Sequence, residues 1–234
     1  MKIGIMQPYI FPYIGYFQLI NAVDCFVIYD NIQYTKKGWI NRNRILSNGK
    51  DEYFTLPLLK DSDFLDVMDR HLSADWHKEK GKLLNKIKEN YRKAPHFNDV
   101  IKLIEDCFNY SSTNLFGFIF NALNKTLDYL SIKTEIVVSS TLPINHHLKA
   151  EEKVIAICKE LHATTYINPI GGTDLYSKEH FLKESIHLQF IKADNIQYKQ
   201  FNNEFIPFLS IIDVMMFNSK SAITNYLNNS FTTI

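Results

Sequence analysis

The chain has 234 residues, enough for one full-sized core, and 46% of them are hydrophobic, as in globular proteins rather than disordered tails. Its 26 lysines and arginines nearly balance 25 aspartates and glutamates, so the net charge of +1 excludes a general attraction to nucleic acid or an anionic membrane. The sequence shows no signal peptide and no apolar run of about 18 residues that could span a bilayer, which predicts a cytoplasmic protein.

A short apolar strand at Ile3–Ile5 opens the chain and leads into an aromatic segment with two prolines, residues 6–17. The apolar residues that follow have helical spacing, so this segment joins the carboxyl end of a strand to the start of a helix. Ligands of α/β proteins bind at such positions. The segment is therefore a predicted binding element, with Gln7, Tyr9 and Tyr16 as its candidate residues.

The second predicted strand, Cys25–Asp30, completes a β-loop-α-β unit within thirty residues. Its apolar character favours parallel pairing with the first strand through a right-handed crossover. Asp30 is then expected at the same sheet edge as the opening loop, where a carboxylate could accept a proton in catalysis.

A basic and polar cluster covers residues 36–44, and a turn at Asn48-Gly49 predicts a hairpin with a strand at Glu52–Leu58. Arginine forks suit phosphate or carboxylate, and an aromatic face suits a base or a sugar. If the segment is extended, Lys37 and Trp39 share a face with the two asparagines, opposite both arginines. A solvated hairpin without function is the alternative. The candidate residues are Lys37, Trp39, Asn41, Arg42, Asn43 and Arg44.

The middle of the chain reads as three consecutive helices, at residues 76–92, 98–109 and 114–130. Alternation then returns, with strands at 134–139, 164–168 and 188–191, helices at 150–161 and 177–183, and two terminal helices. This order predicts an α/β fold, a mostly parallel Rossmann-like sheet with helices on both faces and a helical insertion. The expected division is residues 1–70 and 132–234 for the α/β domain and 71–131 for the insertion or subdomain.

Two later segments also follow predicted strands. Gly171 and Gly172 allow close approach of backbone N–H groups to a ligand, with Asp174 beside them, although tight turns also use glycine for conformational reasons alone. His146 is a candidate general base because the ordinary pKa of histidine lies near neutrality. A surface loop capped by a serine is the alternative reading of the second segment.

The remaining polar and thiol groups favour structural roles. Cys25, Cys107 and Cys158 lie far apart among apolar residues, which predicts buried thiols rather than disulfides. No His or Cys spacing typical of a metal site occurs, so no metal is predicted. Asp213 sits in an apolar predicted helix, residues 205–218, and must either cap a loop or pair with a basic residue, because a buried lone carboxylate is costly.

Several of these segments together resemble the WbqC-like protein family. The resemblance rests on the opening Met6-Gln7-Pro8-Tyr9-Ile10-Phe11-Pro12-Tyr13-Ile14-Gly15-Tyr16-Phe17, the 24–30 strand, the 37–44 cluster and the late Phe208-Leu209-Ser210-Ile211-Ile212-Asp213. Members of that family occur with proteins of bacterial O-antigen and other surface-polysaccharide biosynthesis. The resemblance therefore implies a role in making or decorating a nucleotide-linked sugar.

A more distant similarity is to nucleotidyltransferase-like α/β proteins, whose His-x-Gly-His motif grips ATP. This chain keeps the glycine but has Tyr13 and Tyr16 at the histidine positions, and tyrosine cannot supply an imidazolium charge.

The leading functional hypothesis is a transferase that attaches an acyl or aminoacyl group, glycyl for example, to the amine of a nucleotide-linked amino sugar. Its partners would be that sugar and an acyl or aminoacyl donor. Nucleic acid is not an expected partner, although tRNA stays open as a donor. No cofactor is predicted, with ATP left as an option. The alternatives are a non-catalytic nucleotide-sugar binding protein and an ATP-using ligase or nucleotidyltransferase.

Overall fold

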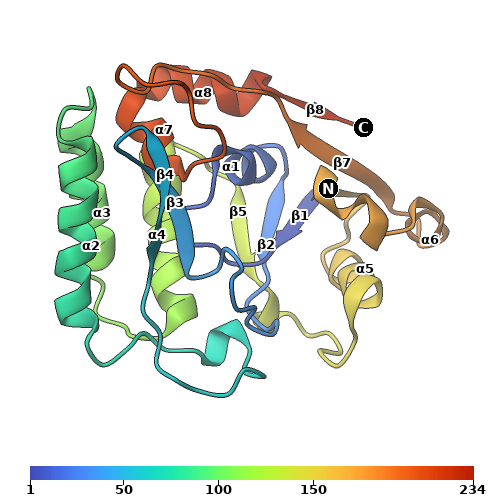
Figure 1. The fold of residues 1–234 in the computed structure, drawn as a ribbon. Helices are drawn as coiled ribbons and strands as arrows, with labels where there is room; N and C mark the ends of the chain where they lie inside the picture. Colours follow the sequence, from blue (N-terminus) through green and yellow to red (C-terminus); the bar gives the residue numbers. More distant parts are fainter.

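The computed structural model describes all 234 residues and is built around a six-stranded sheet with the order β5-β2-β1-β6-β7-β8 (Figure 1). The strands are β1 (Lys2–Met6), β2 (Cys25–Ile28), β5 (Glu135–Val138), β6 (Thr165–Pro169), β7 (His187–Ala193) and β8 (Phe231–Thr233). The first five are parallel to one another, and β8 is antiparallel to β7. The predicted α/β class and mostly parallel Rossmann-like sheet are confirmed, whereas the antiparallel β8 was not predicted.

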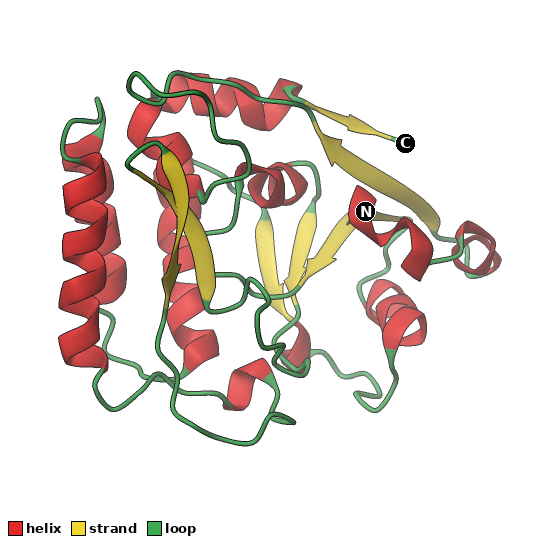
Figure 2. Cartoon of the chain, viewed as in Figure 1, coloured by secondary structure: helices red, strands yellow, loops and turns green.

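Helices cover both faces of this sheet (Figure 2). They are α1 (Ile14–Asn21), α2 (Trp76–Tyr91), α3 (Phe97–Phe108), α4 (Leu115–Leu130), α5 (Ala150–Glu160), α6 (Lys178–Lys183), α7 (Ile211–Phe217) and α8 (Lys220–Asn229), with short 3-10 turns η1 (Val67–Asp69), η2 (Ser139–Thr141) and η3 (Ile170–Leu175). None of them combines the length and the apolar character that a membrane crossing requires.

The central sheet divides the hydrophobic core in two, because successive side chains of its buried strands lie on opposite faces. In β2, Phe26 and Ile28 belong to a cluster of 45 buried residues, whereas Cys25 and Val27 belong to a separate cluster of 14. Successive side chains of a strand point to opposite faces, so a strand buried on both faces needs a continuous apolar run. The larger cluster includes residues of α1, α2–α4, α7 and α8, and the smaller one includes residues of α5 and α6.

The hairpin of β3 (Arg42–Ser47) and β4 (Lys50–Thr55) stands apart from the central sheet. Its turn uses positive φ at Asn48 (49°) and Gly49 (75°), as a two-residue turn with the twist of a hairpin requires. The hairpin is confirmed, but its first strand begins only at Arg42, and Lys37 adopts a left-handed φ of 64° in a preceding turn. The alternating faces expected for residues 37–44 therefore hold only from Arg42 onward.

The C-terminal apolar segment is helical over a shorter range than expected, because α7 begins at Ile211. Its acid, Asp213, is fully buried and accepts hydrogen bonds from Tyr91 Oη (2.8 Å), Tyr198 Oη (2.7 Å) and Gln200 Nε2 (2.8 Å). Of the two roles expected for Asp213, capping a loop or pairing with a basic residue, the pairing does not occur. Three neutral donors compensate the buried carboxylate instead.

All three cysteines are free and buried, as predicted. Burial raises the pKa of the Cys25 thiol to about 11 and those of Cys107 and Cys158 to about 12. Such thiols remain protonated and unreactive in the folded protein.

Candidate functional site

A cavity of about 450 Å³ lies at the carboxyl ends of β1 and β6, the neighbouring strands between which the direction of chain winding reverses. We call it the switch-point cavity. Gln7 and Tyr9 line it from the loop after β1, and Asn168, Gly171 and Gly172 line it from the end of β6 and the turn that follows. In open α/β sheets this crevice is the usual ligand position, because two loops diverge there and leave a gap.

The turn after β6 approaches the side chain of Asn168 closely. A Cβ atom on Gly172 would lie 1.9 Å from Asn168 Nδ2, whereas a Cβ on Gly171 would meet nothing within 4 Å. Asn168 is itself fixed, since its Oδ1 accepts a hydrogen bond from Tyr166 Oη at 2.9 Å and its amide donates to the Pro169 carbonyl at 3.2 Å. Gly172 therefore has a packing requirement for glycine that Gly171 lacks.

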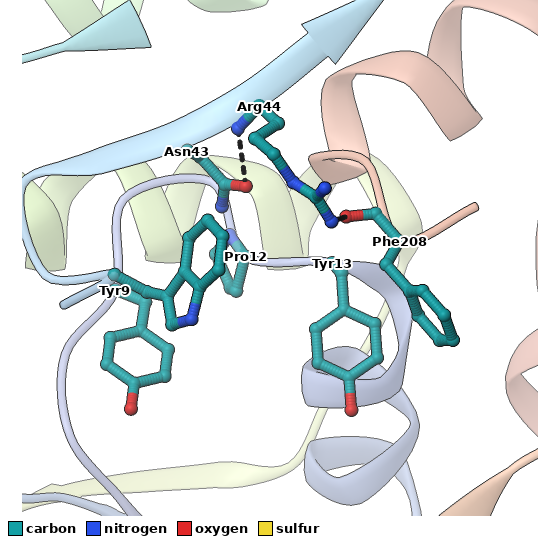
Figure 3. A pocket seen from close by; sticks show the side chains of 7 residues that line it. Tyr9, Pro12, Tyr13, Asn43, Arg44 and Phe208 are labelled. Carbon is teal, nitrogen blue, oxygen red and sulfur yellow. Dashed lines mark hydrogen bonds between the residues drawn. The ribbon is translucent and has the colours of Figure 1, made fainter. Parts of the chain in front are cut away.

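A second, smaller hollow of about 190 Å³ adjoins the opening loop, and we call it the aromatic pocket (Figure 3). It is lined by Tyr9, Pro12, Tyr13, Trp39, Asn43, Arg44 and Phe208. Three chain segments far apart in sequence thus meet there: the opening loop, the 37–44 cluster and the segment before α7. Tyr9 lines both the aromatic pocket and the switch-point cavity.

Arg44 fixes one wall of the aromatic pocket. Its guanidinium donates to the Phe208 carbonyl at 3.2 Å and pairs with Asp51 at 3.0 Å, as Figure 3 shows for the first contact. Phe208 has a left-handed φ of 58° and an exposed fraction of 67%, and its ring meets Tyr13 edge to face at 6.4 Å. A positive φ strains the backbone of a bulky residue, and strained residues concentrate at binding sites.

The indole of Trp39 is the other main wall. It stacks on Tyr53 with a centroid distance of 6.1 Å, and the Arg44 guanidinium carbon lies 5.6 Å from its ring centroid. Arg42 holds the turn beneath it, because Nε donates to the Gly38 carbonyl at 3.0 Å and a second donor reaches the Lys37 carbonyl. The side chain of Lys37 is exposed and lines neither the aromatic pocket nor the switch-point cavity.

The two asparagines of the cluster are buried and act as braces. Asn43 donates to the carbonyls of Ile10 (3.1 Å) and Phe11 (2.8 Å), which fixes the opening loop on the hairpin. Asn41 accepts a hydrogen bond from Tyr34 Oη and donates one to the carbonyl of Leu56, just after β4, both at 2.8 Å. It lines neither of the two hollows.

The two residues predicted as catalytic lie outside both hollows. Asp30 is buried and accepts from the backbone amide (2.9 Å) and hydroxyl (2.6 Å) of Ser140, which places it as a cap on η2. The Asn31 amide donates to His146 Nδ1 at 2.9 Å, and Nε2 donates to the Leu142 carbonyl at 3.0 Å. Both ring nitrogens of His146 are thus engaged in holding the loop after η2.

Two more predicted residues are also absent from the hollows. Tyr16 is buried in the core and donates its hydroxyl to the Gln7 carbonyl at 2.9 Å, so it braces the opening loop from inside. Asp174 is exposed on η3 and lines neither hollow. The structure groups no three His, Cys, Asp or Glu side chains in a way that could hold a metal ion.

Sequence reasoning missed several lining residues. Tyr29 follows β2 directly, Asn168 is the last residue but one of β6, and Tyr176 follows η3, so their positions at the ends of strands and turns were a readable signal for the switch-point cavity. Phe208 offered no such signal, because its exposure depends on a left-handed backbone within an apolar run. Burial raises the pKa values of Tyr9 and Tyr13, and it raises that of Tyr29 to about 12, so these phenols are neutral hydrogen-bonding groups.

Comparison with known proteins agrees with the resemblance seen in the sequence. The model of the WbqC-like protein family matches residues 7–225, which include the opening loop, the hairpin and α7. An uncharacterized protein of Mycobacterium tuberculosis is 30% identical over 230 residues, covering 97% of each chain. No solved structure matches the chain. A family match over nearly the whole length, together with a relative of the same length, shows that this chain belongs to the WbqC-like protein family.

Proposed function

We propose that this protein binds a nucleotide-linked amino sugar and transfers an acyl or aminoacyl group, for example glycyl, to the amine of that sugar. The observation that carries the proposal is the position of the switch-point cavity, between the loops after β1 and β6. Nucleotide ligands of open α/β sheets lie in this crevice. The association of the family with polysaccharide biosynthesis supplies the sugar.

The two hollows suit different parts of such a ligand. The switch-point cavity has aromatic and small residues on its walls, which suits a nucleoside. The aromatic pocket exposes parts of Tyr13, Trp39 and Phe208, which suits the apolar face of a sugar ring. Because Arg44 also lines this pocket, the neutral form of the sugar amine, which is the form that attacks an acyl carbon, is favoured there over the protonated form.

The reaction needs few groups from the protein. The neutral amine nitrogen forms a bond to the acyl carbon while the bond between that carbon and its donor group breaks, and the departing donor group takes up the proton that the amine loses. Holding two reactants in line can itself supply several kcal/mol, on the order of 7–11 in favourable cases. We assign the main contribution to such positioning, since His146 and Asp30 are both occupied in structural hydrogen bonds.

That same observation favours one second candidate, a nucleotide-sugar binding protein without turnover. Both candidates predict binding, and only the transferase predicts a product. ATP enters the proposal only as a source of energy for activating the donor.

The test incubates the purified protein with a panel of nucleotide-linked amino sugars and acyl donors, including aminoacyl-tRNA and free amino acid with ATP. Mass spectrometry should show one sugar gaining the mass of the acyl group. Thermal shift with the sugars alone reports binding, since a ligand of the folded state raises the melting temperature. A shift without a product supports the binding protein, and neither a shift nor a product contradicts both candidates.

A further inference from the structure

A third hollow, of about 510 Å³, lies beside the segment between β4 and η1 and shares no lining residue with the other two. We call it the Arg70 cavity. Its walls are residues 55–63, three residues that precede the hairpin (Tyr34, Lys36 and Asn41), and Arg70, which directly follows η1. The proposed transfer reaction uses no group of this cavity.

The guanidinium of Arg70 is held among residues that themselves line the cavity. Nη1 donates to the Ser62 carbonyl at 2.8 Å, and Nη2 donates to the Leu59 carbonyl at 3.3 Å. Its central carbon lies 4.9 Å from the centroid of the Tyr34 ring. Because Arg70 and all three of these neighbours line the cavity, the charged end of this side chain lies at the cavity wall.

The positive charge of Arg70 has no counter-ion. The residue is 5% exposed, yet it forms no ion pair with a carboxylate. Its Nε is buried without a hydrogen-bond partner, and each terminal nitrogen keeps one N–H beyond the bond that it makes. Two carbonyls and an aromatic ring compensate a buried cation only in part, so an anion in the cavity would supply the partner that the chain itself does not.

The other charged side chains of the walls favour an anion with a single charge. Lys36 and Asp63 form an ion pair at 2.7 Å and neutralise each other. Lys60 forms no ion pair, and Asp61 Oδ1 accepts a hydrogen bond from the Ser62 amide at 2.7 Å. Together with Arg70, the walls carry three cationic and two anionic side chains, so a ligand with one negative charge leaves the cavity neutral.

We propose that the Arg70 cavity binds a singly charged oxyanion, a carboxylate or a phosphodiester, through the guanidinium of Arg70, with the exposed ammonium of Lys60 as a second cation. Arginine suits the oxygens of both groups, because its N–H donors lie in one plane and carry a permanent charge. This site is separate from the switch-point cavity, and its assignment does not depend on the proposed transfer reaction.

The test titrates isotope-labelled wild-type protein with sodium acetate and, separately, with sodium dimethyl phosphate, and follows the protein by NMR. Sodium chloride keeps the ionic strength constant and is the control for screening of charges in general. Saturable shifts should appear at the backbone amides of Leu59 and Ser62 and at the Nε–H of Arg70. Acetate stands for a carboxylate and dimethyl phosphate for a phosphodiester, so the tighter of the two identifies the class of ligand.

Two pairs of variants separate this cavity from the charge of the surface as a whole. Arg70→Met removes the guanidinium, and its control Arg92→Met removes an exposed arginine outside the cavity. Lys60→Met removes the second cation, and its control Lys50→Met removes an exposed lysine at the start of β4. Arg70→Met should weaken binding of the tighter anion roughly tenfold or more, and Lys60→Met about twofold to fivefold, because an exposed charge contributes less than a buried one. Neither control should change the affinity.

Arg70→Met also removes two hydrogen bonds to the Leu59–Ser62 segment, so its amide spectrum must first show the wild-type fold. The wild-type titration and the Lys60→Met variant do not depend on this condition. The assignment is overturned if neither anion shifts the signals of Leu59, Ser62 and Arg70, if the shifts lie only elsewhere in the protein, or if folded Arg70→Met binds the anion as tightly as the wild type.

Discussion

The indole of Trp39 stacks on Tyr53 and lies near the Arg44 guanidinium, and Trp39, which is 38% exposed, lines the aromatic pocket. Trp39→Ala should therefore remove a ligand-facing wall and weaken binding of the nucleotide sugar roughly tenfold, which corresponds to about 1.4 kcal/mol. Tyr110→Ala is the matched control, because Tyr110 is an aromatic residue of similar exposure (39%) that lines neither hollow. Titration calorimetry measures both, and equal affinities for the two variants would contradict a binding role for Trp39.

Asp213 is a buried acceptor whose replacement should be costly for a different reason. In Asp213→Asn, an amide group replaces one carboxylate oxygen, so a hydrogen-bond donor faces Tyr91 or the Tyr198–Gln200 pair, which are donors themselves. A mispaired buried donor costs about 1–3 kcal/mol, measurable by urea denaturation. Asp63→Asn, which removes an exposed pair with Lys36, should cost no more than about 1 kcal/mol.

The difference in stability between the wild type and Asp213→Asn should also depend on pH. Desolvation raises the pKa of Asp213, and its three hydrogen bonds oppose that shift only in part. Folding therefore favours the protonated form. The stability contributed by this protonation is fully present below the ordinary pKa of 3.8 and is lost as the pH rises through the raised value. The stability advantage of the wild type over Asp213→Asn should thus shrink as pH rises across that window, and an advantage that grows would contradict the raised pKa.

For single residues, the sequence predicts which chemical groups a site offers more readily than which partner each side chain binds. The 37–44 cluster was identified as a group of forks, amides and a stacking surface, and Trp39 and Arg44 do line a pocket. The amides of Asn41 and Asn43 instead satisfy buried carbonyls of other segments. Which partner an amide finds depends on long-range packing, which local spacing does not encode.

The turn between β6 and η3 allows a test of one structural element with paired substitutions. Gly172→Ala places a Cβ against Asn168, whose own hydrogen bonds resist movement, so overpacking should cost roughly 1–3 kcal/mol of stability. Gly171→Ala has free space and should stay within about 0.5 kcal/mol of the wild type. Urea denaturation separates them, and equal stabilities would show that Asn168 moves aside easily.

Elements with strong local signals were predicted to within a few residues. Helices α2–α4 and the parallel strands have long periodic or apolar patterns, and the Asn48-Gly49 turn has its own chemistry. The elements that were predicted wrongly or not at all depend on contacts with distant parts of the chain. Strand β8 is three residues long and exists through pairing with β7, and the start of α7 is set at Ser210, whose hydroxyl donates to the Phe11 carbonyl at 2.7 Å.

For the whole molecule, the open question is whether residues 71–131 form a subdomain that unfolds independently. The larger core cluster argues against independence, because it runs without a break from α2–α4 through the hairpin and α7 to α1 and β2. A segment that shares its apolar contacts with the sheet loses most of its stabilisation when the sheet unfolds. We therefore expect a single cooperative unfolding transition.

The three buried cysteines report this directly, since Cys107 lies in α3, Cys25 in β2 and Cys158 in α5 on the opposite face of the sheet. A buried, protonated thiol reacts only after its surroundings open. Brief thiol labelling at increasing urea concentrations, read by peptide mass spectrometry, should show all three sites becoming reactive over one concentration range. Labelling of Cys107 at clearly lower urea than Cys25 and Cys158 would instead identify the helical segment as a unit that opens first, with the sheet and its switch-point cavity still folded.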